Sequence, residues 1–267
     1  MNNADLIIVD DLAHAFCKIF ERFYKESSSP KISFFATGGS QANLCYPLLA
    51  DTLASMTQEH FGVDLFLGDE RLVPVRNQAS NTLLIDSLLF GKRRQPWQEV
   101  SFYSPAYGAA RELEELVAVE DNPAKKTDEG LKDALRLILS NYDKLLSKSQ
   151  TPRFVHLGLG PDGHVASLFP DTSNLGLALE HCQISIDTSG RNPHYRISMT
   201  MEFINQSDLV VLSVSTKEKG LVLAKVFDDP KKYPAGQLDP KKLIILADRQ
   251  ASLALGRPLT ATGFDHI

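Results

Sequence analysis

The feature that most constrains the fold is a series of short apolar runs that alternate with helical segments. These runs cover residues 32–36, 63–67, 154–157, 209–214 and 243–246. Each of them is mainly apolar and none alternates regularly with polar residues, which is typical of strands buried on both faces. Strands interleaved with helices predict a mostly parallel twisted sheet with helices on both faces, which is a Rossmann-like α/β architecture.

Helical spacing of apolar residues fills the intervals between the runs. It predicts helices over residues 11–25, 42–56, 81–90, 129–148, 218–227 and 249–255. Two further strands are predicted over 183–186 and 195–199, with a turn between them. The stretch 91–122 is less regular, and we interpret its basic triplet at 92–94 as a solvated turn. No repeat, low-complexity tract or linker interrupts the chain, so we expect one α/β domain over residues 1–267.

Composition excludes several classes of partner. The chain has 267 residues, a net charge of −5 and 43% hydrophobic residues, which is an ordinary globular balance without a basic surplus for nucleic acid. No apolar run approaches the roughly 20 residues that cross a bilayer. The first 11 residues carry three aspartates and lack the positive start of a signal peptide. We expect a cytoplasmic protein without a nucleic-acid or membrane partner, as a monomer or small homo-oligomer.

Three cysteines are spread far apart along the chain. Cys17, Cys45 and Cys182 form no Cys-x-x-Cys pair, and their number is odd. This pattern indicates neither a zinc site nor a disulfide framework. We therefore expect three reduced, partly buried thiols.

The first of three informative loops is Thr37-Gly38-Gly39-Ser40, which follows the apolar run 32–36. Glycines let backbone N–H groups approach an anion closely, and the helix that follows adds its positive end. A phosphate suits such a loop. Many strand-to-helix turns need glycine for tightness alone, so these letters by themselves leave both interpretations open.

The second loop is Gly68-Asp69-Glu70-Arg71, with three adjacent charges directly after a buried strand. Charges are rarely buried without partners. One interpretation is an ion-pair network at the strand end. The other gives Arg71 to an anionic substrate or transition state, with Asp69 orienting the site.

The third loop, GLGPDGHVASLFP, spans Gly158 to Pro170 and begins with a match to G-x-G-x-x-G. A dinucleotide-binding unit needs a full helix after its glycines. Pro170 lies seven residues beyond Gly163, and proline breaks helix interiors, so only a short helix is expected here. The glycine pattern is therefore weak support for a nicotinamide cofactor.

What remains in the third loop is Asp162-Gly163-His164. The glycine permits a sharp turn that projects His164 at the mouth of the sheet. An imidazole is the side chain best suited to proton transfer at neutral pH, and Asp162 is placed to fix its tautomer. A lone histidine is more often structural, but this position at a strand end favours a functional one.

Two more cations begin elements near the same edge. Arg196 starts a predicted strand, and Lys219 starts a predicted helix. Either position reaches a phosphate, although Lys219 taken alone reads more simply as a surface lysine. The chain has no Gly-x-Ser-x-Gly elbow, no Gly-x-x-x-x-Gly-Lys-Ser/Thr loop and no His-Glu-x-x-His pair. An esterase serine, NTP hydrolysis and a catalytic zinc are therefore not supported.

Together the three loops resemble the 6-phosphogluconolactonase family. The family's Ser-Gly-Gly-Ser is matched by Thr37 to Ser40, its Asp-Glu-Arg-x-Val-Pro by Asp69 to Pro74, and its Ser-Asn by Ser80-Asn81. The Asp-Gly-His segment matches almost throughout Gly158 to Pro170. Arg196, Lys219, Tyr233-Pro234-Ala235 and Asp248 follow in the family's order. Two departures, Gln41-Ala42 and Thr216 in place of a glycine, touch the presumed phosphate side.

The resemblance implies a sugar-phosphate isomerase-type fold and hydrolysis of 6-phospho-D-glucono-1,5-lactone in the oxidative pentose phosphate pathway. It implies a phosphate site at Gly38, Gly39 and Ser40 with Lys219 and Arg196. His164 would activate water, and Arg71 or nearby N–H groups would stabilise the oxyanion. Asp162 and Asp69 would orient these groups. Neither a metal nor an organic cofactor is implied.

Two alternatives stay open. The related glucosamine-6-phosphate deaminases share an Asp-Gly-His loop, but their loop carries a glutamate where this chain has Phe169. A lactone is an activated ester that needs fewer acid–base groups than a deamination, so Phe169 favours the lactonase. A non-catalytic sugar-phosphate-binding module would keep the glycine loop and Lys219 without needing His164.

Overall fold

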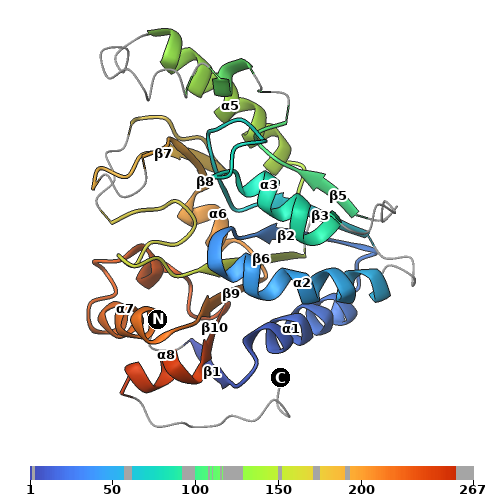
Figure 1. Ribbon diagram of the computed structural model, residues 1–267, viewed down its shortest axis with the longest axis vertical. Coiled ribbons are helices and arrows are strands. Elements are labelled where there is room, and N and C mark those ends of the chain that lie inside the picture. The colour runs from blue at the N-terminus through green and yellow to red at the C-terminus, as the bar shows by residue number, and fades with distance from the viewer. Residues whose placement is uncertain are drawn as a thin grey trace.

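The centre of the molecule is a seven-stranded parallel sheet (Figure 1). The computed structural model describes residues 1, 4–56, 62–91, 100–107, 109, 111–114, 116, 129–149, 152–170, 175–189 and 193–256. The strands are β1 (Asp5–Val9), β2 (Lys31–Ala36), β3 (Gly62–Leu67), β4 (Asp69–Arg71), β5 (Val100–Tyr103), β6 (Arg153–Gly158), β7 (Cys182–Ser185), β8 (Arg196–Met199), β9 (Leu209–Val214) and β10 (Leu243–Asp248). The helices are α1 (Leu12–Glu26), α2 (Gly39–Met56), α3 (Asn81–Ile85), η2 (Asp86–Phe90), α5 (Glu129–Leu146), α6 (Met201–Asn205), α7 (Lys217–Asp228), η4 (Pro234–Gln237) and α8 (Arg249–Ala254).

The order of the strands places a crevice near the middle of the large sheet. That order is β1-β10-β9-β6-β2-β3-β5, and every neighbouring pair is parallel. From β2 the chain builds outward through β3 and β5 on one side, and β6, β9 and β10 extend the sheet on the other. Loops leave in opposite directions at such a reversal, so ligands bind beyond the carboxyl ends of its strands.

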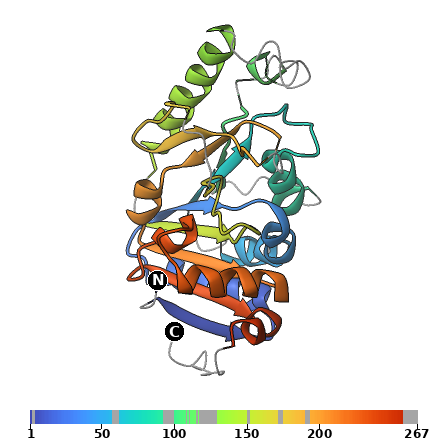
Figure 2. The ribbon, with the colours of Figure 1, turned by 90° about the vertical axis from the view of Figure 1, so that its left-hand side faces the viewer.

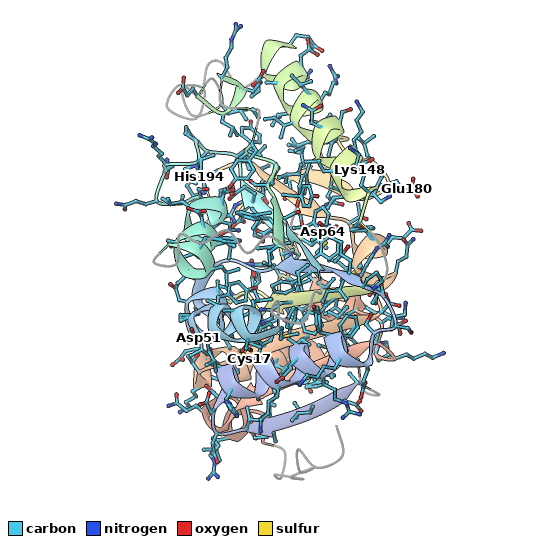
Figure 3. All side chains as sticks on the ribbon, turned by 90° about the vertical axis from the view of Figure 1, so that its right-hand side faces the viewer. Cys17, Asp51, Asp64, Lys148, Glu180 and His194 are labelled. Carbon is cyan, nitrogen blue, oxygen red and sulfur yellow. The ribbon has the colours of Figure 1, made fainter. Side chains whose placement is uncertain are left out.

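Helices cover both faces of this sheet, as the apolar runs predict. Successive residues of a strand point to opposite faces, and Phe34 packs in the core beneath α1 and α2, while Phe35 packs in the core that includes α5 and α7. Phe154 and Val155 divide in the same way on β6. Figure 3 labels Cys17 on α1, which is buried, and Asp51 on α2, which is exposed on the outer side of the helix layer. The predicted α/β architecture is confirmed.

A second, antiparallel sheet of order β4-β8-β7 stands beside the first, next to α5 (Figure 2). Residues Gly68 to Arg71 were predicted to form a loop, and that prediction is wrong for Asp69–Arg71, which forms β4. Gly68 alone turns the chain: its N–H donates to Ala36 O at 2.8 Å, and its carbonyl accepts from Met199 N at 2.9 Å. One residue therefore links the two sheets, and a three-residue strand carries too few letters for a pattern.

Other boundaries differ from the predictions for local reasons. The expected short helix after Gly163 is absent: Val165 and Leu168 form an isolated bridge, and Ala166 has a φ of 50°. The predicted helix 81–90 divides into α3 and the π-helical turn η2. Strands β1 and β5, at the two edges of the sheet, were not predicted, and β5 falls in the stretch 91–122 that has no regular pattern.

The basic triplet at 92–94 lies outside the described residues. All three cysteines are free and buried. Among the helices that the structure describes, none has the length and apolar character needed to cross a membrane.

Candidate active site

A cavity of about 190 Å³ opens beyond the carboxyl ends of four adjacent strands, β9, β6, β2 and β3. A water molecule occupies about 30 Å³ of liquid, so the cavity holds a small molecule rather than one water. The glycine loop follows β2, the Asp-Gly-His loop follows β6, and Arg71 follows β3. Residues far apart in the sequence meet because parallel strands end at one edge.

The glycine loop forms one wall of the cavity. Gly39 has a φ of 66°, in the region that favours glycine. Gly38 packs against a buried side chain, since a Cβ at this position would lie 2.0 Å from Asn81 Oδ1. Lys219 lies opposite, and its Nζ donates to Ser40 Oγ at 2.9 Å. Burial lowers the pKa of Lys219. Backbone N–H groups at the start of α2 and this ammonium group therefore face the same space.

The approach to Lys219 contains a strained residue. Thr216 has a φ of 79° and a ψ of 153°, which only glycine adopts readily. Its N–H donates to Asp248 Oδ2 at 3.0 Å. This is the position where the resembling family has glycine. The other departure, Gln41, donates from Nε2 to Ser215 Oγ at 2.8 Å, so it ties α2 to the segment before α7.

His164 and Asp162 form a pair at the cavity. His164 Nδ1 lies 2.5 Å from Asp162 Oδ1, and the backbone N–H of His164 also donates to that oxygen at 3.2 Å. Burial raises the pKa of Asp162, but its hydrogen bonds and charge interaction with His164 outweigh that effect and hold the pKa at about 2. An ionised carboxylate accepts, so it fixes the proton on Nδ1. Within the described part of the chain nothing bonds to Nε2, which leaves its lone pair available.

The loop around His164 depends on two glycines. Gly163 has a φ of 82°, and a Cβ there would also lie 2.5 Å from the ring of Tyr233. A Cβ on Gly160 would lie 2.2 Å from two atoms of the His164 ring. Phe169 closes the far side of the imidazole, edge-on at 4.9 Å between ring centroids. The ring therefore has little freedom to leave its position.

Two arginines face each other across the smaller sheet. Arg71 of β4 is the antiparallel partner of Arg196 on β8, and like charges placed opposite each other repel. Burial, and then the charge of Arg71, lower the pKa of Arg196 to about 10. Arg71 Nη1 donates to Ala79 O at 2.5 Å, while its Nε has no partner among the described residues. Both arginines line the cavity, so they bring positive charge to it.

Asp69 partly compensates the two arginines. It is buried, with Oδ2 accepting from Ser167 Oγ at 2.6 Å and lying 3.8 Å from Arg196 Nη1. Asp69 therefore orients Arg196 rather than His164. Asp69 makes an ion pair, as the first interpretation of the charged segment expects, and Arg71 lines the cavity, where its role toward an anion stays a prediction.

Glu70 points away from the cavity and organises the wall behind it. Its carboxylate accepts from the N–H groups of Arg71, Asn81 and Thr82, each at 2.7 Å. The hydroxyl groups of Ser80 and Thr82 donate to it as well. Burial raises the pKa of Glu70, and these bonds oppose that rise. The carboxylate fixes the start of α3 against β4.

The cavity brings the predicted residues together. It is lined by Gly38, Gly39, Ser40, Asp69, Arg71, His164, Arg196 and Lys219, and Asp162 stands directly behind His164. Asn81 and Gln41 also line it, although no role was assigned to them. Their signal was the Ser-Asn match and the departure after Gly-Gly-Ser. Among the described residues, no three His, Cys, Asp or Glu side chains are placed to hold a metal ion.

Comparison with known proteins shows the family to which the chain that forms this cavity belongs. The model of the family described as "Glucosamine-6-phosphate isomerases/6-phosphogluconolactonase" matches residues 7–246. A 6-phosphogluconolactonase of Caulobacter vibrioides is 30% identical over 72% of each chain. A probable 6-phosphogluconolactonase of Drosophila melanogaster is 33% identical over 54% of this chain, and the match spans 61% of the fly protein.

The fold is also similar to that of a solved structure. The 6-phosphogluconolactonase structure from Leishmania guyanensis superposes with a TM-score of 0.71 at 20% identity, covering 97% of this chain and 99% of that one. An identity this low shows the fold alone, but the family model covers most of the sequence, including all three loops. The chain belongs to the glucosamine-6-phosphate isomerase/6-phosphogluconolactonase family.

Proposed function

We propose that this protein hydrolyses 6-phospho-D-glucono-1,5-lactone to 6-phosphogluconate, a step of the oxidative pentose phosphate pathway. The observation that carries the proposal is His164, which has Asp162 on Nδ1 and, among the described residues, no partner on Nε2, at a cavity that Arg71, Arg196 and Lys219 also line. Relatives from Caulobacter vibrioides and Haemophilus influenzae, matched over 72% and 85% of this chain, are named 6-phosphogluconolactonases, which supports the same activity.

Binding begins at the phosphate. Gly38, Gly39 and Ser40 present backbone N–H groups at the start of α2, and Lys219 adds a positive charge. Arg196 contributes from the opposite wall. Binding energy at this remote group positions the lactone carbonyl near His164, which lowers the entropic part of the barrier.

The chemical steps need one base and one anion stabiliser. Neutral His164 takes a proton from water at Nε2 while the water oxygen bonds to C1. The carbonyl electrons move to oxygen, and Arg71 or nearby N–H groups stabilise the resulting oxyanion. When the carbonyl reforms, the bond from C1 to the ring oxygen breaks, and the imidazolium returns its proton to that oxygen. Asp162 holds the ring throughout, and Asp69 holds Arg196.

Phe169 favours hydrolysis over deamination. The family description names both isomerases and the lactonase, so membership does not choose between them. A deaminase must open a sugar ring and shuttle protons at carbon, and the related enzymes carry a glutamate at this place in the loop. Here Phe169 is buried against His164 and lies 6.0 Å from the Arg196 guanidinium. An apolar ring at this point supplies no acid or base.

A panel of three substrates tests the proposal. The lactone is generated in situ from glucose 6-phosphate, and 6-phosphogluconate formation is followed above the spontaneous rate. Glucono-1,5-lactone without phosphate and glucosamine 6-phosphate are assayed beside it. We expect acceleration with the phosphorylated lactone, a much lower kcat/KM without the phosphate, and no ammonia from the amino sugar. Ammonia release without lactone hydrolysis would instead establish the deaminase. Binding of a sugar phosphate without turnover of any of the three substrates would establish the non-catalytic sugar-phosphate-binding module.

A further inference from the structure

We infer that Tyr46 and His156 are positioning residues for phosphate binding, because they hold the elements of the cavity together through one buried chain of hydrogen bonds. This inference rests on the proposed phosphate site. Neither residue lines the cavity, and the mechanism above uses neither.

The chain of hydrogen bonds runs through the core in three steps. Thr37 N–H donates to Tyr46 Oη at 2.9 Å, Tyr46 Oη lies 3.0 Å from His156 Nδ1, and His156 Nε2 lies 2.9 Å from Ser213 Oγ. Tyr46, His156 and Ser213 are fully buried, and Thr37 is nearly so. Buried polar groups of this kind depend on their partners, since no water replaces a bond that is lost.

The directions of the bonds follow from the one proton of the Tyr46 hydroxyl. A backbone N–H can only donate, so Tyr46 accepts from Thr37, and His156 Nδ1 is the acceptor that the described residues place for the buried Tyr46 proton. Burial raises the pKa of Tyr46 well above its usual value and lowers that of His156 to about 3, so both stay neutral. A neutral imidazole that accepts at Nδ1 carries its proton on Nε2, and it donates to Ser213. The reverse arrangement would leave the buried Tyr46 proton without an acceptor among the described residues, which is costly in the core.

The chain of hydrogen bonds joins the segments that carry the candidate site. Thr37 is the first residue of the glycine loop, and Tyr46 lies on the helix that this loop begins. His156 lies on β6, two residues before the loop that carries His164. Ser213 pairs in register with Gly158 and precedes α7, which carries Lys219.

Loss of this chain of hydrogen bonds should affect binding of the substrate's phosphate more than the chemistry at its carbonyl. The bond from Thr37 fixes the plane of the first peptide in the glycine loop, and hence how the following N–H groups face the cavity. His164 has separate support from Asp162, Gly160 and Phe169. Losing the Tyr46 hydroxyl should therefore loosen the phosphate wall and leave the base in place.

Tyr46→Phe tests the inference, with Tyr24→Phe as the matched control. Tyr24 is another buried tyrosine, on α1, and it does not line the cavity. We expect Tyr46→Phe to raise KM for the phosphorylated lactone about fivefold or more, with kcat within about twofold, because the lost bond affects binding rather than the base. Its kcat/KM on glucono-1,5-lactone should stay unchanged. Tyr24→Phe should leave all these values at the wild-type level.

His156→Gln serves as a second variant in case Tyr46→Phe does not fold, and it should show the same split between KM and kcat. Calorimetric titration with inorganic phosphate separates this inference from the proposed function. If the wild type has no lactonase activity, weaker phosphate binding in Tyr46→Phe still supports the inference. Wild-type phosphate affinity and KM in both variants, or equal losses on both lactones, would overturn it.

Discussion

Two histidines on one strand-and-loop segment have opposite environments. His156 lies in the middle of β6, fully buried, stacked on Phe16 at 4.0 Å and bonded at both ring nitrogens. His164, eight residues later, has one nitrogen bonded to Asp162 and the other at the cavity. The same side chain is a fixed structural link in one place and a group able to accept a proton in the other. The difference comes from exposure to the cavity and from Nε2 of His164, to which no described residue bonds.

Among the residues that surround His164, the largest effect is expected at Arg71, which lines the same cavity. Arg71→Ala should lower kcat/KM on the order of 100-fold, the usual loss when one donor to an oxyanion is removed. Thermal stability should not fall by much, because the change removes the repulsion between Arg71 and Arg196. The exposed residue Arg76 provides the control variant, Arg76→Ala, with wild-type kinetics. Wild-type kcat/KM in Arg71→Ala would remove this residue from the chemistry.

Asp162→Asn tests whether the tautomer of His164 matters. An asparagine amide can donate to Nδ1, which shifts the ring proton to Nε2 and fills the lone pair at the cavity. We expect kcat to fall by about 10- to 100-fold with little change in KM, part of what a general base contributes. Steady-state kinetics on the phosphorylated lactone measure both constants. A raised KM at unchanged kcat would mean that Asp162 helps to bind substrate instead.

The buried histidine predicts a pH dependence of stability. Burial lowers the pKa of His156 to about 3, whereas the unfolded value is about 6.5. As pH falls below about 6.5, the unfolded chain binds a proton at this residue and the folded chain does not until about pH 3. Folding stability from this group is therefore lost by up to about 1.4 kcal/mol per pH unit in that window.

Urea unfolding of the wild type and His156→Gln at pH 7, 6 and 5 measures this loss. The glutamine does not titrate, so the wild type should lose stability more steeply than the variant as pH falls. The carboxylates titrate in both proteins and cancel in the difference. Parallel curves would show that His156 is accessible to protons in the folded state.

The smallest effect is expected at Thr216, whose backbone is strained. A non-glycine residue in this region costs about 1–3 kcal/mol, and glycine's greater freedom in the unfolded chain returns part of that. Thr216→Gly should thus raise the free energy of unfolding by about 1 kcal/mol without lowering kcat. Thr200→Gly, at a helix cap with an ordinary φ of −71°, should show no such gain. A loss of stability in Thr216→Gly would mean that other contacts of the threonine outweigh the strain.

The sequence predicts the inner strands of the large sheet, β10, β9, β6, β2 and β3, and the loops around the cavity, because both depend on local patterns. Strands buried on both faces are read directly, as at residues 209–214, where the prediction and β9 coincide. The glycines and His164 mark their loop by type and spacing. These signals need no knowledge of what lies across the fold.

The remainder depends on contacts between distant residues. Strand β4 exists because Arg71 pairs with Arg196, which is 125 residues away by number, and three letters give no period. The expected helix after Gly163 fails because Ser167 bonds to Asp69 and Ser198 instead of continuing a helical ladder. His156 reads as an interruption of an apolar run, and only the fold supplies Tyr46 and Ser213 as its partners.

The most direct test of the account compares the two histidines by their kcat for 6-phospho-D-glucono-1,5-lactone. His164→Ala and His156→Gln are assayed beside the wild type, at a temperature where all three are folded. The account predicts that His164→Ala loses on the order of 100-fold or more in kcat, the scale of a general base, while His156→Gln keeps kcat within about twofold. Near-wild-type kcat in a folded His164→Ala would contradict it.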